Sequence, residues 1–259
     1  MMLILLSIVP TRFYVIIKTL YSRLHGQKMR FTMNDGKIQI QEGKIFWTAP
    51  RSRCHLYSLG LVNRGESIGK SYQLEKIEFK RKDFIIDCGA NMGDLQLYFV
   101  AVGLEVNYIG IEPNPLDYSY LKYNLQSESK ALNVALWNVS EELQFFVDAA
   151  SSSSSIIEPK KFDSTIIIHA KRLDSIDLPQ RIKLLKIEGE GAEPEILLGS
   201  ESILDRVEYI SVDSGPERGT KEDSTSASVL NYLINRNFEV VSLNRGHRET
   251  ILFKNRKIA

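Results

Sequence analysis

The chain has 259 residues, of which 43% are hydrophobic and 25% are charged; this composition is typical of a globular protein with one large core. Its 33 basic and 32 acidic residues give a net charge of +1. This near-equality of positive and negative charges disfavours nucleic acid as a partner. Two cysteines, Cys54 and Cys88, cannot form a disulfide framework, so we expect a reducing, cytoplasmic compartment.

The N-terminus is strongly apolar. Residues 1–9 are almost wholly apolar, and residues 13–20 are largely apolar after an interruption at Pro10 and Arg12. Neither run reaches the roughly 18–20 residues of a membrane span, and the flanks do not match a signal peptide. We expect a helix packed on its own domain. The alternative is an interfacial helix that gives residues 1–24 a peripheral membrane contact.

Residues 31–47 have the pattern of a β-meander, with turns at Asn34-Asp35-Gly36 and Glu42-Gly43. A polar, glycine-containing stretch follows over 63–70, and residues 72–79 predict a short helix. We therefore assign residues 1–80 to an N-terminal helix and β extension, and residues 81–259 to the main domain.

From residue 84 onward, short apolar runs alternate with helical patterns. Asn114-Pro115 is a typical helix start, with an N-cap followed by a first-turn proline. The alternation predicts an α/β fold with a doubly wound, mostly parallel sheet. The expected strands are 84–88, 106–111, 132–136, 143–147, 165–169, 182–187, 207–212, 238–243 and 250–253, and the expected helices are 94–102, 114–125, 191–198 and 227–235. The five serines at 151–155 predict a loop, either a spacer or a set of hydroxyls facing a ligand.

A glycine-rich turn follows the strand expected at 84–88. Asp87, Gly89, Asn91 and Gly93 form a D-x-G-x-N-x-G pattern, in which glycine lets the backbone turn sharply and approach a ligand. The spacing differs from the G-x-G-x-x-G of dinucleotide folds. Asp87 would repel a pyrophosphate, but it suits the ammonium group of S-adenosylmethionine (SAM), either directly or through water.

Glu112 ends the next expected strand, in Gly110-Ile111-Glu112-Pro113-Asn114. A carboxylate at this place can accept hydrogen bonds from both hydroxyls of a ribose. A free 2′-hydroxyl fits adenosine in NAD or in SAM. Because the phosphate-binding glycines are lacking, the pair Asp87 and Glu112 favours SAM as the cofactor.

A third acidic segment follows the strand expected at 182–187. Glu188, Glu190 and Glu193 alternate with glycines there. We predict that Glu188 and Glu190 are catalytic, by orienting an attacking hydroxyl or taking its proton. Glu193 is instead interpreted as a helix N-terminal carboxylate. No oxygen-ligand loop of recognisable spacing is present, so no metal is predicted.

Four segments together resemble the FkbM-type methyltransferases: FIIDCGANMG at 84–93, YIGIEPN at 108–114, NVAL at 133–136 and LLKIEGEGAEPEILLG at 184–199. The resemblance implies a class I methyltransferase fold, SAM as cofactor, and mostly O-methylation of hydroxyls such as those of sugars or polyketides. It suggests Asp87, Gly89, Asn91 and Gly93 in the cofactor turn and Glu112 on the ribose. It also suggests Asn133, Ala135 and Leu136 near the adenine. The family usually has Asp where this chain has Glu188.

The sequence therefore predicts a SAM-dependent O-methyltransferase acting on a hydroxyl of a sugar, glycan or other small molecule. One alternative is a nucleic-acid methyltransferase, which the near-zero charge and the lack of an N-P-P-[YF] or D-P-P-[YF] run disfavour. Another is a non-catalytic SAM-binding or scaffold protein.

Overall fold

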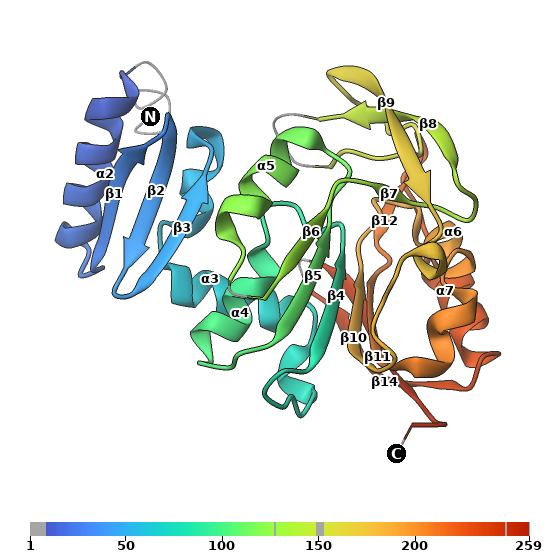
Figure 1. The fold of residues 1–259 in the computed structure, drawn as a ribbon. Helices are drawn as coiled ribbons and strands as arrows, with labels where there is room; N and C mark the ends of the chain where they lie inside the picture. Colours follow the sequence, from blue (N-terminus) through green and yellow to red (C-terminus); the bar gives the residue numbers. More distant parts are fainter. Residues whose placement is uncertain (1–8, 127, 149–152, 247, 259) are drawn as a thin grey trace.

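A computed structural model describes residues 9–126, 128–148, 153–246 and 248–258. Figure 1 shows a small N-terminal helix-and-sheet unit at one end of the molecule and a larger α/β unit beside it. The apolar residues 1–8 and Ser151 and Ser152 lie outside the described residues.

The N-terminal unit consists of one helix and an antiparallel meander. Helix α2 (Thr11–Leu24) packs against strands β1 (Met29–Asn34), β2 (Lys37–Glu42) and β3 (Ile45–Ala49), which pair in that order. The meander is as predicted, and its first turn has positive φ at Asp35 and Gly36. The core of this unit also contains Met92, Leu97 and Tyr120 of the following fold, so the two parts share a continuous core.

The segment between the meander and the large sheet differs from the expectation. Residues 63–70 lie within helix α3 (Leu61–Ser71), preceded by the 3-10 helix η1 (Arg51–Tyr57). The helix predicted at 72–79 is wrong, because only the 3-10 turn η2 (Leu74–Lys76) forms there. The glycines of α3 serve close packing on α4: a Cβ on Gly65 would lie 2.4 Å from the carbonyl oxygen of Leu97.

The large sheet has seven strands in the order β14-β15-β11-β10-β4-β5-β6. All neighbours pair in parallel except β15, which runs antiparallel to both β11 and β14. This confirms the predicted class I methyltransferase-like fold with an N-terminal helix and meander. The strands are β4 (Phe84–Cys88), β5 (Asn107–Ile111), β6 (Lys130–Leu132), β10 (Ile182–Ile187), β11 (Val207–Asp213), β14 (Phe238–Arg245) and β15 (Glu249–Asn255).

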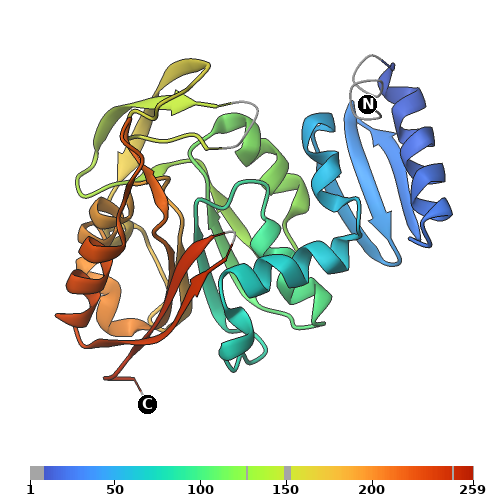
Figure 2. The same ribbon diagram turned by 180° about the vertical axis from the view of Figure 1, so that it is seen from behind.

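Helices cover both faces of this sheet (Figure 2). Alternate residues of each strand point to opposite faces, so Ile85 packs with one buried cluster and Ile86 with another. The first cluster includes residues of α3, α4 (Asp94–Ala101) and α5 (Pro115–Asn124). The second includes residues of α6 (Glu193–Leu198) and α7 (Ser226–Ile234).

A smaller three-stranded sheet, β7-β9-β8, lies beyond the carboxyl ends of the parallel strands (Figure 1). It consists of β7 (Ala135–Leu136), β8 (Glu141–Val147) and β9 (Ser164–Lys171). The single strand predicted at 132–136 is therefore wrong: it divides at Asn133 between two sheets. The short strands β12 (Pro216–Arg218) and β13 (Asp223–Ser224) and the 3-10 helices η3 (Leu173–Ser175) and η4 (Glu201–Arg206) complete the fold.

Helix α2 follows the apolar N-terminal residues, and one of its faces packs on the meander through Tyr14 and Val15. The expected packing of the N-terminal helix on its own domain holds for this face, whereas Phe13, Ile16, Ile17, Leu20 and Leu24 on its other side are exposed. Over the described ranges, no helix combines the length and the apolar character needed to cross a bilayer.

Candidate active site

The glycine turn after β4 is built from residues in the left-handed backbone region. Gly89, Asn91 and Gly93 have φ of +71°, +51° and +90°. A Cβ on Gly89 would lie 2.1 Å from the carbonyl oxygen of Glu188, so the close approach that requires glycine here is to the loop after β10. The turn ends at Gly93, the N-cap of α4.

Glu112 joins this turn to the loop after β5. One carboxylate oxygen accepts a hydrogen bond from the Asn91 backbone N–H at 2.7 Å, and the other from the Asn114 N–H at 2.8 Å. The side chain is buried, and its burial, together with the nearby negative charge of Asp117, raises the pKa of Glu112 to about 7. Each oxygen still has capacity to accept another hydrogen bond from a ligand.

Asp87 is held inside the protein by two partners. Its carboxylate pairs with Lys186 of β10 at 2.9 Å and accepts a hydrogen bond from the Tyr108 hydroxyl at 2.5 Å. The Lys186 ammonium also donates to the carbonyls of Cys88 and Gly89, at 3.0 and 2.8 Å. Lys186 therefore fixes the glycine turn as well as neutralising Asp87.

The two predicted catalytic acids differ in their surroundings. The Glu188 carboxylate forms ion pairs with Lys186, at 2.9 Å, and with Arg248, which also pairs with Asp213. No basic side chain among the described residues forms such a pair with Glu190, which has φ +50°. Burial, followed by the negative charges of Glu217 and then Glu193, raises the pKa of Glu190 well above its ordinary value.

Glu193 is structural, as expected. One of its oxygens accepts hydrogen bonds from the backbone N–H groups of Gly189 and Gly191 at 2.9 and 3.0 Å, and the other accepts one from the Thr225 hydroxyl at 2.8 Å. These contacts shape the loop that carries Glu190.

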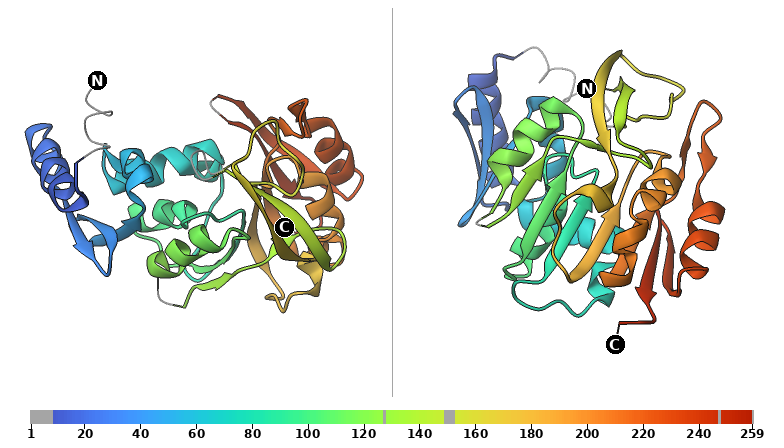
Figure 3. Two further views of the ribbon diagram at one scale, coloured as in Figure 1. Left: turned by 90° about the horizontal axis from the view of Figure 1, so that it is seen from above. Right: turned by 45° about the vertical axis from the view of Figure 1, so that its right-hand side comes forward.

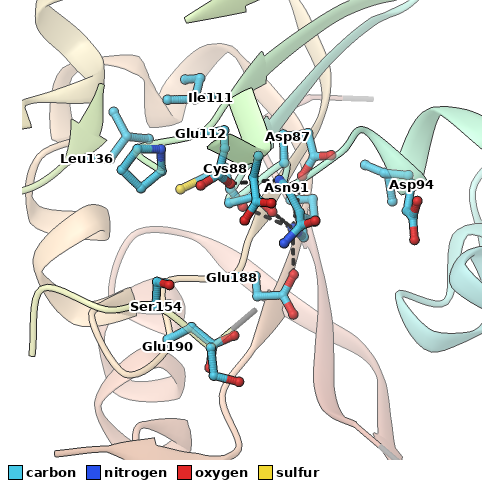
Figure 4. Close-up of a pocket in the computed structure, with 18 of the residues that line it drawn as sticks. Asp87, Cys88, Asn91, Asp94, Ile111, Glu112, Leu136, Ser154, Glu188 and Glu190 are labelled. Carbon is cyan, nitrogen blue, oxygen red and sulfur yellow. Dashed lines mark hydrogen bonds and ion pairs between the residues drawn. The ribbon is translucent and has the colours of Figure 1, made fainter. Parts of the chain in front are cut away.

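These groups surround one cavity of about 560 Å³ at the carboxyl ends of β4, β5 and β10. Figure 4 shows Glu112 and Asn91 on one side and Glu188 and Glu190 on the other, with Ser154 beside Glu190. The cavity brings together eight of the ten predicted site residues: Asp87, Gly89, Asn91, Glu112, Ala135, Leu136, Glu188 and Glu190.

The family model for the methyltransferase FkbM domain matches residues 87–240, more than half of the chain. The chain belongs to the FkbM methyltransferase family.

One solved structure of the family agrees with this assignment at the level of the fold. The methyltransferase FkbM from Methylobacillus flagellatus KT is 15% identical, with a TM-score of 0.50, over 69% of this chain and 44% of that protein. This chain thus spans less than half the length of that relative. The TrmK protein of M. capricolum, solved with S-adenosyl-homocysteine (SAH), is also similar, at 10% identity and a TM-score of 0.41 over 74% of this chain and 68% of that one. No curated protein matches the sequence.

Two predicted site residues of this FkbM family member lie outside the cavity lining. Gly93 caps α4 and faces Leu121 and Trp47. The Asn133 amide donates to the carbonyls of Glu112 and Pro113, at 2.8 and 3.0 Å. Asn133 therefore holds the backbone on which the Glu112 carboxylate is mounted.

The serine loop contributes to the cavity. Ser153, Ser154 and Ser155 line it, and the Ser155 hydroxyl donates to the Glu190 carbonyl at 2.9 Å. Of the two interpretations of this loop, the structure favours serines that face the cavity over a simple spacer.

Acidic groups outnumber basic ones in the cavity lining, by seven to three. Most are compensated, as Asp94 is by Arg64 and Glu188 by Lys186 and Arg248. The acids for which no ion pair is found within the described residues are Glu112, Glu190 and Glu217. Burial raises the pKa of Glu217 to about 7. The described part of the chain contains no cluster of three or more His, Cys, Asp or Glu side chains placed to hold a metal.

Sequence reasoning missed four charged residues that shape this site. Lys186 and Arg248 bind the site carboxylates, Glu217 adds a carboxyl near Glu190, and Arg53 donates to the Asn91 side chain at 2.8 Å while pairing with Asp117. Only Lys186 had a visible signal, as a lysine near the carboxyl end of a central strand that is apolar apart from it and Lys183.

Proposed function

We propose that this FkbM methyltransferase binds SAM in the cavity and transfers its methyl group to a hydroxyl of a sugar, glycan or other small molecule. One observation carries the proposal: a cavity at the carboxyl ends of β4, β5 and β10 is rich in acids, three of them without a basic partner among the described residues. Such a cavity suits a cationic sulfonium better than an anionic ligand.

The residues present fit the cofactor at both ends. Glu112 offers a buried carboxylate for ribose hydroxyls, and Ile111, Val134 and Leu136 give the neighbouring wall an apolar surface for an adenine ring. Asp87, Lys186 and Arg248 offer charges of both signs for an amino-acid group. A volume of about 560 Å³ lies within the range of small-molecule sites.

When bound, SAM supplies a methyl group already activated by the positive sulfur. The acceptor hydroxyl must lose its proton as its oxygen takes the methyl group, and we assign that proton to the Glu190 carboxylate. Burial and the negative charge of Glu217 raise the pKa of Glu190 well above its ordinary value, so Glu190 has the higher proton affinity that a proton acceptor needs. General-base assistance is typically worth roughly 10²–10⁴ in rate.

Glu188 serves a different purpose in this proposal. Lys186 and Arg248 hold its carboxylate through two ion pairs. It is suited to positioning the loop and the substrate rather than to accepting a proton.

The acidic lining also bears on the acceptor. A phosphate group would meet the unpaired carboxyls of Glu190 and Glu217 at short range. The part of the acceptor that enters the cavity is therefore expected to be an uncharged hydroxyl-bearing group rather than a nucleic-acid backbone.

The test is turnover of labelled SAM by the purified chain against a panel of sugars, glycans and small alcohols, with RNA and a no-acceptor sample in parallel. We expect transfer to a hydroxyl acceptor, reduced roughly 10²–10⁴-fold in Glu190→Gln with unchanged SAH affinity. Glu142→Gln, on the exposed side of β8, is the matched control. Methylation of RNA alone, or full activity in Glu190→Gln, would contradict the proposal.

A further inference from the structure

The outer face of helix α2 is apolar and uncovered. Five large apolar side chains at helical spacing are 40–84% exposed, whereas the buried face of the same helix includes Lys18 and Ser22. The helix thus presents its most apolar stripe away from its own core. This stripe, the α2 stripe, consists of Phe13, Ile16, Ile17, Leu20 and Leu24.

The buried polar residues show that this orientation is fixed by specific contacts. The Lys18 ammonium donates to the Ser58 hydroxyl at 2.8 Å and lies over the Phe31 ring. The Ser22 hydroxyl accepts from the Met29 N–H and donates to the Gln27 carbonyl, at 3.2 and 3.1 Å. Rotating the helix to bury the stripe would break these bonds.

The surroundings of the stripe are strongly basic. Residues 1–34 contain five Lys and Arg residues and no Asp or Glu, although the whole chain has a net charge of only +1. Four of these basic residues are exposed: Arg12, Arg23, Lys28 and Arg30.

Three of them gather at one end of the stripe. Arg23, Lys28 and Arg30 line a hollow of about 440 Å³ at the turn between α2 and β1, next to Leu24, the most exposed residue of the stripe. Apolar side chains beside a cationic hollow match the acyl region and the anionic headgroup of a phospholipid.

The position of α2 leaves this surface free. The helix lies on the far side of the meander from the α/β unit, in views from the front and from above (Figures 1 and 3). Nothing else in the described parts of the chain covers the stripe, whose residues remain exposed.

We propose that the α2 stripe and the basic hollow form a docking surface for an anionic phospholipid membrane, with α2 lying in the plane of the interface. Anionic headgroups occupy the hollow of Arg23, Lys28 and Arg30, and the stripe enters the boundary between headgroups and acyl chains. A second copy of the chain is the less suitable occupant. A symmetric dimer would place this all-basic surface against itself, and the like charges would repel.

Co-sedimentation of the full chain with lipid vesicles tests the proposal. We expect binding to phosphatidylcholine vesicles containing roughly one third phosphatidylserine, and weak binding to phosphatidylcholine alone, since each basic residue near an anionic surface contributes about fivefold in affinity. Salt at about 1 M, which shortens the Debye length to about 3 Å, should release most of the protein.

Two pairs of substitutions separate the apolar and basic contributions. Ile16→Glu with Leu20→Glu should weaken binding at least about tenfold, because the stripe would carry charges that must be buried. Arg23→Glu with Lys28→Glu should remove the preference for anionic lipid. The matched controls, Ile167→Glu on β9 and Lys221→Glu, replace exposed residues elsewhere and should bind as the wild type does.

Circular dichroism and the thermal midpoint establish that each variant is folded. The proposal would be overturned if the wild-type protein did not bind anionic vesicles, or if the α2 variants bound them as well as the wild type does. Concentration-dependent self-association that is lost in Ile16→Glu with Leu20→Glu, without any vesicle binding, would replace it with a homodimer interface.

Discussion

Replacing Glu112 by glutamine should separate ligand binding from folding stability. The ionised carboxylate accepts two backbone hydrogen bonds at 2.7 and 2.8 Å, and an amide can replace only one acceptor. The lost bond and the unpaired N–H should cost about 1–3 kcal/mol. Burial raises the pKa of Glu112 from 4.5 to about 7, so keeping it ionised in the fold costs about 3 kcal/mol. Above pH 7, Glu112→Gln loses the hydrogen bond but no longer has to keep a buried carboxylate ionised. These two changes in the free energy of unfolding nearly cancel.

The raised pKa of Glu112 fixes the direction in which folding stability changes with pH. In the unfolded chain Glu112 loses its proton near pH 4.5, whereas in the folded chain it keeps the proton to about pH 7. The folded state therefore binds more protons in this window, and stability falls as the pH rises from about 4.5 to 7. Glu112→Gln should lose about 3 kcal/mol less than the wild type over that range.

SAH affinity should respond differently. Without the carboxylate, the ribose hydroxyls lose a charged acceptor worth about 1.5–3 kcal/mol, so we expect Kd to rise about 10- to 100-fold. Urea unfolding at several pH values gives the stability, and a fluorescence titration with SAH gives Kd, with Glu142→Gln as the control. Unchanged SAH affinity, or stability that falls equally with pH in both proteins, would refute the assigned role and pKa.

Three further variants test other parts of the site. Gly89→Ala should destabilise the fold by at least about 2 kcal/mol, because φ is +71° and the new Cβ would lie 2.1 Å from a backbone carbonyl oxygen; a neutral change in urea unfolding would contradict the turn geometry. Arg53→Met leaves the buried Asp117 unpaired and should cost about 3–5 kcal/mol at pH 7, whereas wild-type stability would show that the pair is dispensable. Glu217→Gln should lower the pKa of Glu190, since the charge of Glu217 contributes to its elevation. The acidic limb of the pH–rate profile should then move to lower pH; a limb that stays in place would show that Glu217 does not affect the protonation of Glu190.

Much of the site could be predicted because it depends on local sequence. The apolar run of β4, the glycines after it and the Asn114-Pro115 helix start are short-range signals, and the Asn114 side chain does cap α5. In a parallel sheet the ends of β4 and β5 meet at one edge. The meeting of Asp87 and Glu112 therefore followed from the order of elements.

The rest depends on contacts between distant residues. The polar, glycine-containing stretch at 63–70 gave no helix prediction, yet Gly65 is required where α3 packs closely on the backbone of α4. Arg248 reaches Glu188 from β15's side of the sheet across 60 residues of sequence. Asn133 matched a family motif, yet only the fold shows that it supports the Glu112 backbone. The division at residue 80 stays a prediction.

Isothermal titration calorimetry of the wild-type protein with SAH tests the central claim most directly. We predict one binding site per chain with a dissociation constant in the micromolar range, and competition by SAM for that site. Absence of any binding heat up to millimolar SAH, from protein shown to be folded, would contradict the assignment of the acid-lined cavity as the cofactor site.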